Sequence, residues 1–165
     1  MRLTAGKKAV GVFDKWDKRF MEMARLIATW ASCYQAERKI GAVVVKDKRI
    51  MTTGYNGAPA GIRTCVERGE CLRRKLGIES GTRQELCYAV HAEQNAIIQA
   101  AKLGVSIDGA TLYCTHQPCI LCAKMIVNAG IRRVVYQQGY PDAFSLEILS
   151  EAGVLVERYE EVEER

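Results

Sequence analysis

Residues 91–136 read HAEQNAIIQAAKLGVSIDGATLYCTHQPCILCAKMIVNAGIRRVVY, and this stretch decides the fold of the chain. Its first part carries apolar residues at the three- and four-residue spacing of one helix face, namely Ala92, Ala96, Ile97, Ala100 and Leu103. We therefore expect a helix over 91–103, and a second helix over 119–129 by the same criterion. A glycine follows each of them, at Gly104 and Gly130, as is common at a helix end.

Short apolar runs rich in β-branched residues separate the helices and predict strands. Outward from 91–136, the two patterns together predict helices at 15–32 and 143–152, and strands at 40–45, 49–54, 110–115, 133–136 and 154–156. Strands that alternate with helices in this way indicate an α/β domain, with helices packed on a mixed sheet. The sequence contains neither an internal repeat nor a domain boundary.

The composition is that of an ordinary folded protein. The chain has 165 residues, of which 48% are hydrophobic and 26% are charged, and these values exclude a disordered or collagen-like chain. No apolar run approaches the ~20 residues that cross a bilayer, and the start of the sequence lacks the apolar segment of a secretory signal. We expect a cytoplasmic protein with no membrane partner.

Positive charge is in excess but unevenly distributed. The chain carries 24 Lys and Arg against 19 Asp and Glu, a formal net charge of +5. Residues 157–165 form an acidic tail with five acids and two bases, a net charge of −3, so the preceding residues carry +8. This balance suits a protein that handles an anionic substrate such as a nucleotide, and equally a protein with ordinary solvated lysines.

The cysteines favour metal binding over disulfides. There are seven of them, an odd number, and nothing in the sequence indicates an oxidising compartment. Cys65, Cys71 and Cys87 fall in residues 58–88, which show neither helical nor strand periodicity. A stretch of this length is unusual in a compact domain unless something holds it in place. Cys114, inside an apolar run, is expected to belong to the core.

Two short motifs carry the residues expected to do chemistry: His91-Ala92-Glu93 and Pro118-Cys119-Ile120-Leu121-Cys122. Zn²⁺ prefers thiolate and imidazole ligands in a tetrahedral shell, and catalytic sites leave the fourth position to water. Cysteines three residues apart at a helix start point to the same side, where exposed backbone N–H groups favour the thiolate form. We therefore expect His91, Cys119 and Cys122 to hold one catalytic zinc ion.

Glu93 distinguishes a catalytic zinc site from a purely structural one. Two positions along a helix correspond to a rotation of about 200°, so His91 and Glu93 are not expected to ligate the same ion. A carboxylate beside the metal can instead take a proton from an activated water and pass it to a substrate. The pattern H-x-E…P-C-x-x-C is the signature of zinc nucleobase deaminases. His116, the other of the two histidines, is expected at the rim of the pocket.

Five segments together resemble the deoxycytidylate (dCMP) deaminases over about residues 15–159: Trp16-Asp17…Phe20-Met21, Ile40-Gly41-Ala42-Val43, Gly54-Tyr55-Asn56-Gly57-Ala58-Pro59, His91-Ala92-Glu93-Gln94-Asn95-Ala96-Ile97 and Pro118-Cys119-Ile120-Leu121-Cys122-Ala123-Lys124. The resemblance implies a three-layer α/β/α cytidine-deaminase-like fold, with a five-stranded mixed sheet and helices on both faces. It implies one zinc-dependent deaminase domain at 15–165, after an N-terminal extension at 1–14 and with a cysteine-containing insert at 58–88. The implied reaction is hydrolytic deamination of dCMP to dUMP with release of ammonia, which supplies dUMP for thymidylate synthesis.

The resemblance also implies which residues bind nucleotides. Lys124 and Tyr140 match positions that contact the substrate in this family, and a cation and a hydroxyl suit a 5′ phosphate. A loop associated with nucleotide and effector binding matches Gly54, Tyr55, Asn56 and Gly57. By their residue types alone, its glycines permit close approach and Asn56 can bond a sugar hydroxyl, with a plain turn as the alternative.

Regulation and assembly are implied in the same way. Members of the family are frequently activated by dCTP and inhibited by dTTP, and Mg²⁺ would accompany such a nucleotide effector. They form oligomers, so we expect a hexamer or a dimer of this chain. No nucleic-acid partner is expected.

Some members of the family bind a second, structural zinc ion that fastens the insert. The matching candidates here are Cys33, Cys65, Cys71 and Cys87. The sequence departs from the family at the first ligand, because Gln35 stands where the cysteine is usual and Cys33 lies two residues earlier. A shift of two residues moves a side chain by ~3 Å in a helix, so ligation by Cys33 requires a different backbone path. The alternative is a set of reduced structural thiols.

Other activities share part of this pattern. A free-nucleoside cytidine deaminase usually has cysteine in place of His91 and lacks the long insert, and a tRNA adenosine deaminase usually has glutamate in place of Gln117. A competence-associated homologue shares the chemistry, because that name describes gene context more than activity. A non-catalytic zinc module would fit the charge and the cysteines but would leave Glu93 without a role.

Overall fold

The computed structural model describes residues 13–79 and 81–161 of the 165-residue chain. Most of the predicted extension at 1–14, and residues 162–165 of the acidic tail, lie outside the described residues. Within the described part, no helix is both long enough and apolar enough to cross a membrane.

A five-stranded mixed sheet forms the centre of the molecule. Its strands are β1 (Gly41–Lys46), β2 (Arg49–Tyr55), β3 (Thr111–His116), β4 (Arg133–Gln138) and β5 (Leu155–Arg158), in the order β2-β1-β3-β4-β5. β1 is antiparallel to both β2 and β3, whereas β3, β4 and β5 run parallel. The mixed sheet predicted from the sequence is confirmed.

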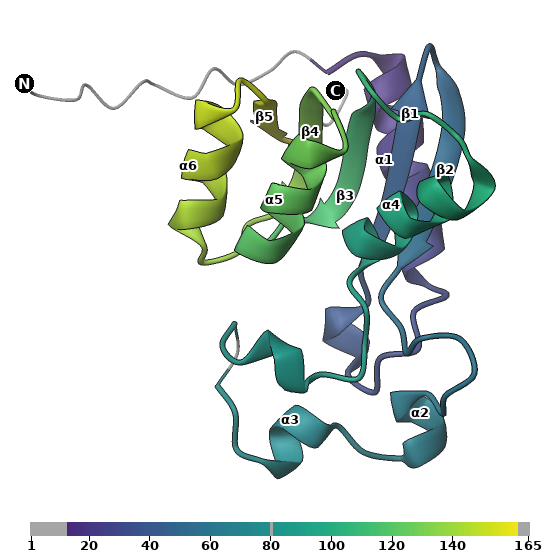
Figure 1. Cartoon of the computed structure of the whole chain (residues 1–165), viewed down its shortest axis with the longest axis vertical. Helices are drawn as coiled ribbons and strands as arrows, with labels where there is room; N and C mark the ends of the chain where they lie inside the picture. The colour runs from purple at the N-terminus through teal and green to yellow at the C-terminus, as the bar shows by residue number, and fades with distance from the viewer. Residues whose placement is uncertain (1–12, 80, 162–165) are drawn as a thin grey trace, which may run out of the picture.

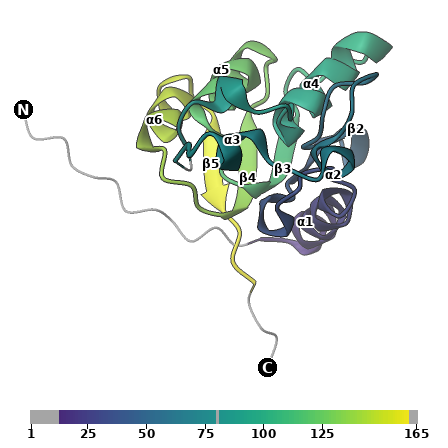
Figure 2. The same ribbon diagram turned by 90° about the horizontal axis from the view of Figure 1, so that it is seen from below.

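Helices cover both faces of the sheet, which gives three layers. On one face lies α1 (Lys15–Ala28), and on the other lie α4 (Ala92–Leu103), α5 (Ile120–Asn128) and α6 (Ala143–Glu151) (Figures 1 and 2). Alternate residues of a strand serve the two sides: Val43 packs with α1, whereas Ala42 and Val44 pack with α4 and α5. The expected three-layer α/β/α fold is confirmed.

The helix α1 is shorter than its apolar pattern predicts. Asp14 caps its first turn and Asp17 completes the capping box, as the sequence favours. The helix ends at Ala28 rather than near residue 32 because the backbone N–H of Ser32 donates to the carbonyl of Asn56 (3.2 Å). That hydrogen bond draws the chain out of the helix and toward the loop that follows β2.

The insert at 58–88 folds into short pieces beyond one end of the sheet (Figure 1). These are α2 (Cys65–Arg68), α3 (Leu72–Lys75) and the 3₁₀ turn η2 (Gln84–Leu86), and the turn η1 (Ala36–Arg38) lies at the same end. Two backbone hydrogen bonds between Gly57 and Val90, of 3.2 and 2.8 Å, close the neck of the insert. The insert is therefore a closed loop whose two ends are bonded to each other beside the sheet.

Candidate active site

The first motif lies where α4 begins. His91 is the N-cap residue, with extended backbone, and its N–H donates to the side chain of Gln94 (3.0 Å). Glu93 follows in the first turn of the helix, where the helix dipole favours an acidic group. The motif thus places an imidazole and a carboxyl group at one helix terminus.

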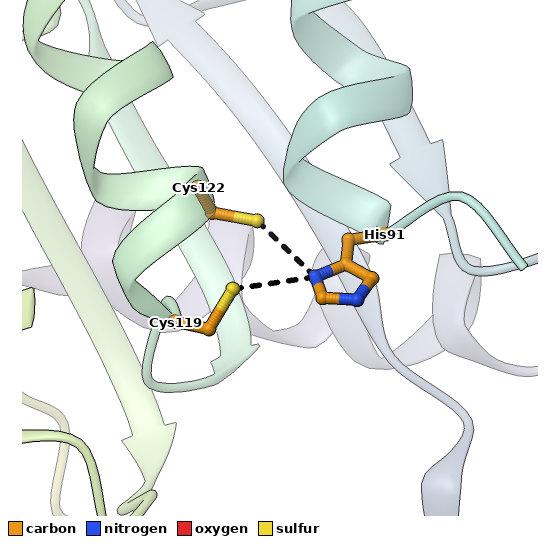
Figure 3. Close-up of side chains that lie close together, drawn as sticks. All are labelled: His91, Cys119 and Cys122. Carbon is orange, nitrogen blue, oxygen red and sulfur yellow. Dashed lines mark hydrogen bonds between the residues drawn. The ribbon is translucent and has the colours of Figure 1, made fainter. Parts of the chain in front are cut away.

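The second motif lies at the start of α5. Cys119 is the N-cap residue and Cys122 stands in the first turn. Both sulfurs face the same nitrogen of His91, with Nδ1 3.4 Å from Cys119 Sγ and 3.3 Å from Cys122 Sγ (Figure 3). The three residues come together because the N-termini of α4 and α5 meet at the carboxyl end of β3.

These three side chains fit a zinc ion. Their ligand atoms lie within 4.8 Å of one another, and among the described residues theirs is the one group of three or more metal-ligating side chains this compact. Tetrahedral zinc with Zn–N of about 2.0 Å and Zn–S of about 2.3 Å requires N–S separations of about 3.5 Å. The two measured N–S distances lie close to this value.

The thiols of Cys119 and Cys122 share a hydrogen bond that shifts their pKa values in opposite directions. The hydrogen bond that it shares with Cys122 lowers the pKa of Cys119 to about 4. The same bond, together with burial, raises the pKa of Cys122 well above its usual value. Burial acts to lower the pKa of His91, but the bond to Cys119 and the charge of Glu93 outweigh it and raise that pKa. The pair therefore gives up its first proton readily, and a bound dication favours loss of the second.

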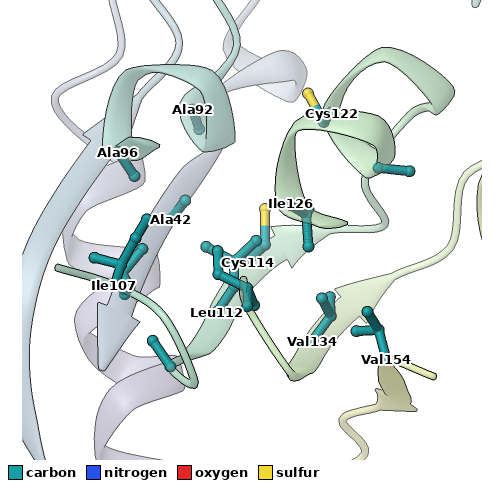
Figure 4. Packing of buried hydrophobic residues seen from close by; sticks show 14 of the residues in the cluster. Ala42, Ala92, Ala96, Ile107, Leu112, Cys114, Cys122, Ile126, Val134 and Val154 are labelled. Atoms are coloured by element: carbon teal, nitrogen blue, oxygen red, sulfur yellow. The ribbon is translucent and has the colours of Figure 1, made fainter. Parts of the chain in front are cut away.

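Glu93 lies beside the ligand group and outside it. Its side chain is only 4% exposed, and burial raises the pKa of its carboxyl group. The Cys114 thiol lies beside this carboxyl group, where burial and the charge of Glu93 both raise its pKa. Figure 4 shows Cys114 on β3 among Leu112 and Ile126, and the expectation that it belongs to the core is confirmed.

A cavity of about 300 Å³ opens above this group. Its lining includes His91, Glu93, Cys119, His116 and Tyr140. Burial lowers the pKa of His116, whose ring contacts the hydroxyl of Thr115 (3.0 Å). The structure therefore brings two of the three predicted zinc ligands, His91 and Cys119, together with the predicted acid and Tyr140 around one space.

The residues of the loop at Gly54–Gly57 differ in how they lie relative to the cavity. Asn56 lines the cavity, but its amide also braces the fold: Oδ1 accepts from the N–H of Ile40 and Nδ2 donates to the carbonyl of Arg38, both at 2.7 Å. Gly54 faces α4, since a Cβ there would overlap the backbone of that helix. Tyr55 is exposed and packs edge-on against Trp30, away from the cavity lining.

Lys124 is not brought into the site. It is exposed on α5 and does not line the cavity. The reason is its position two residues after Cys122, a rotation of about 200° from a side chain that faces inward. The contact of Lys124 with the substrate that the family resemblance implies stays a prediction.

Sequence reasoning missed two arginines that line the cavity. Arg38 comes from η1, and Arg73 comes from α3 in the insert. Gln117 was missed too: its amide donates to the carbonyl of Asp142 (2.9 Å) and so holds the loop that carries Tyr140. No local pattern marks these residues, because only the path of the insert brings Arg73 to the cavity.

The four remaining candidate ligands lie near one another without forming a compact metal-binding group. The charges of Cys71 and Cys87 act on Cys33 and Cys65, and Cys33, Cys71 and Cys87 line the cavity. No three of these sulfurs lie within 4.8 Å of one another. Gln35, at the position where the family has cysteine, donates from Nε2 to Cys71 Sγ (3.3 Å). The second zinc site stays a prediction.

Comparison with known proteins agrees with this geometry. Residues 14–138 match the family described as the cytidine and deoxycytidylate deaminase zinc-binding region. ComE operon protein 2 of Bacillus subtilis is 39% identical over 146 residues, which are 88% of this chain and 71% of that protein. The deoxycytidylate deaminase of Schizosaccharomyces pombe is 39% identical over 145 residues, 87% of this chain but only 44% of that protein.

A solved relative extends the comparison to three dimensions. The crystal structure of the dCMP deaminase from the cyanophage S-TIM5, in complex with dCMP and dUMP, matches with a TM-score of 0.72 and 32% sequence identity. The match covers 90% of this chain and 100% of that chain. On the sequence match and on the geometry of its zinc-ligand set, the chain belongs to the cytidine and deoxycytidylate deaminase family.

Proposed function

We propose that the protein catalyses the hydrolytic deamination of dCMP to dUMP and ammonia, and that residues 15–165 act as one deaminase domain. The observation that supports this most strongly is the buried Glu93, which lines a cavity of about 300 Å³ together with His91 and Cys119 of the compact ligand group. The relative from S-TIM5, whose structure holds dCMP and dUMP, supports the same substrate.

His91, Cys119 and Cys122 would hold the zinc ion. When bound there, zinc supplies a Lewis acid that lowers the pKa of a water molecule. These residues leave Glu93 free for proton transfer, because none of its oxygens belongs to the ligand group. Burial raises the pKa of this carboxyl group, which makes it a stronger proton acceptor than an exposed carboxylate.

Glu93 moves two protons in this mechanism. It takes the first from the attacking water and donates it to N3 of cytosine while the water oxygen bonds to C4. It then carries the second proton of that oxygen to the amino group, and the C4–N bond breaks to release ammonia. Asn56 and Tyr140 line the cavity and would contact the sugar and the phosphate.

Further properties belong to the proposal as well. Regulation by dCTP and dTTP with Mg²⁺, a homo-oligomer, and a second zinc ion on the insert are proposed on the resemblance to the family. For the second zinc ion, Cys65, Cys71 and Cys87 are the candidate ligands, together with Cys33. A zinc content of two equivalents per chain supports it, and one equivalent contradicts it.

A panel of substrates tests the proposed function. The purified protein is incubated with dCMP, deoxycytidine, cytosine and an adenosine-containing tRNA loop, and ammonia release is measured for each. We expect dCMP to be the preferred substrate by kcat/KM. Preference for deoxycytidine or for the tRNA loop would assign the site to a different deaminase, and no ammonia from any of them would contradict a deaminase. Repeating the dCMP assay with added dCTP or dTTP tests regulation.

A further inference from the structure

Arg73 is an unusual residue for an insert on the surface of the protein. Its side chain lies inside, with only 9% of the residue exposed, whereas its neighbour Arg74 is exposed and pairs with Glu37 (3.6 Å). Arginine is rarely buried to this extent unless its charge is paired. A buried guanidinium on this short helix of the insert therefore requires an explanation.

Arg73 forms no ion pair among the described residues, although its charge acts on the exposed carboxylate of Glu85. Nη2 donates to the carbonyl oxygen of Glu79 (2.8 Å), a neutral acceptor. Within residues 13–79 and 81–161, no carboxylate lies within ion-pair distance of this guanidinium. Since a guanidinium has five N–H donors, most of them are left for another acceptor.

The position of Arg73 points to that acceptor. Arg73 lines the cavity that also exposes His91 and Glu93, and Arg38 from η1 lines it too. The charges of both arginines act on the Tyr140 hydroxyl, which accepts a hydrogen bond from Gln84 (3.2 Å). Two guanidinium groups and a phenol thus share the lining of this cavity.

The cavity lining therefore combines a proton-transfer group with cationic groups. With the reacting base beside Glu93, the 5′ substituent of a bound nucleoside would lie among the other lining residues, which include Arg73 and Arg38. A free 5′ hydroxyl gains little from a buried cation, whereas a phosphate gains charge-assisted, bidentate hydrogen bonds. We propose that Arg73, carried by the cysteine-containing insert, binds the 5′ phosphate and makes the site select a nucleoside monophosphate over the nucleoside.

This inference rests on the proposed function for the reacting base, and it assigns to the insert the discrimination between nucleotide and nucleoside. The test uses Arg73→Gln, which removes the charge but keeps an amide donor for the carbonyl of Glu79. Arg74→Gln is the matched control, because it removes the same charge one residue away on the exposed side of α3. Each variant is checked for zinc content and for its melting temperature.

Two measurements are made on each protein. The first is kcat/KM for dCMP and for deoxycytidine. The second is the Kd of dUMP and of deoxyuridine by calorimetry, which does not depend on turnover. For Arg73→Gln we expect kcat/KM for dCMP to fall, and the affinity for dUMP to weaken, by about 10- to 100-fold. This is the range expected for losing a hydrogen bond to a charged group. In the same variant, kcat/KM for deoxycytidine and the Kd of deoxyuridine should change less than about 3-fold. Arg74→Gln should match the wild type in all four quantities.

An equal loss for nucleotide and nucleoside would overturn the inference, since it would mean that Arg73 only supports the fold, and no loss for either would overturn it as well. Where Arg73→Gln does not fold, Arg73→Lys replaces it. That variant keeps the charge without the planar fork, and unchanged discrimination between dUMP and deoxyuridine would then count against bidentate binding. If the wild type deaminates nothing but binds dUMP more tightly than deoxyuridine through Arg73, the proposed function fails and the phosphate site stands.

Discussion

His91 and Glu93 owe their shared site to a change of backbone conformation between them. On a continuous helix they would diverge by about 200°. His91 is instead the N-cap residue, with φ −69° and ψ 155°, and only Glu93 has helical backbone. Both side chains therefore border one cavity, although only His91 belongs to the compact ligand group.

Glu93→Gln separates metal binding from catalysis. Glutamine has the same shape but cannot carry a proton, so the variant should keep its zinc ion while kcat for dCMP falls by about 10²- to 10⁴-fold. Zinc content and initial rates check this prediction. The neighbouring Gln94 cannot serve as a control position, because its side chain accepts a hydrogen bond from the N–H of His91. A suitable control is Glu151→Gln, an exposed position on α6 that does not line the cavity. Near-wild-type turnover by Glu93→Gln would remove Glu93 from the mechanism.

At the residue scale, the sequence predicts what a short motif encodes. The HAE motif and the spacing of Cys119 and Cys122 identify the acid and the ligands. They can do so because the residues of each motif lie within one helical turn of one another. Lys124 was assigned to the site through family resemblance, and its helical direction takes it elsewhere. Arg73 was missed because long-range folding of the insert, not local sequence, brings it to the cavity.

At the scale of elements, close packing of α4 on β2 depends on one glycine. A Cβ at Gly54 would overlap the carbonyl oxygen of Ala92 and the amide nitrogen of Ala96. The sequence suggested a loop glycine that approaches a nucleotide, and the structure gives it a packing role. The strand and helix therefore meet backbone to backbone, which sets where His91 stands.

Gly54→Ala should accordingly destabilise the protein. We expect a loss of about 2–4 kcal/mol in the free energy of unfolding, because α4 must move away from β2 to admit the methyl group. Urea denaturation measures it. Gly139→Ala is the control, since a Cβ there meets nothing within 4 Å and its backbone needs no positive φ. Equal stability of the two variants would show that the contact is not tight.

The helices and strands themselves could be predicted closely, and the reason is periodicity. Residues 110–115 and 133–136 were predicted as strands, and β3 and β4 occupy Thr111–His116 and Arg133–Gln138. These strands are buried on both faces and so read as apolar runs. The insert has no such pattern, because its short helices depend on contacts with distant segments rather than on an apolar face of their own.

At the scale of the whole molecule, one ion-pair network joins α1 to the sheet on the face opposite the site. Arg133 on β4 donates to Asp17 of α1 and to Glu157 of β5, both at 2.6 Å. The Tyr113 hydroxyl on β3 also donates to Asp17 (2.7 Å). Burial acts to raise the pKa of Asp17, but these hydrogen bonds outweigh it and lower that pKa.

Asp17→Asn should destabilise the protein in a pH-dependent way. At pH 7 we expect a loss of about 1–3 kcal/mol, less than for a fully buried pair because Arg133 keeps Glu157. Since the folded state lowers the pKa, the contribution of Asp17 is complete above its unfolded pKa of about 3.9 and is lost as the pH falls through the folded value. The difference between wild type and variant should therefore shrink below about pH 4.

Urea denaturation between pH 3 and pH 7 tests this prediction. Glu70→Gln is the control, because the exposed pair of Glu70 with Lys75 should contribute less than about 1 kcal/mol at any pH. A difference between wild type and Asp17→Asn that stays constant across this range would mean that the charge of Asp17 is not what stabilises the fold.

The central claim is that His91, Cys119 and Cys122 hold the zinc ion on which deamination of dCMP depends. The most direct measurement is conversion of dCMP to dUMP and ammonia by the purified protein, before chelation, after removal of the metal, and after one equivalent of zinc per site is restored. We predict equal amounts of dUMP and ammonia from the zinc-loaded protein, a loss of more than about 10²-fold on chelation, and recovery with zinc. Undiminished turnover by the fully metal-free protein, or none by the zinc-loaded protein, would contradict the claim.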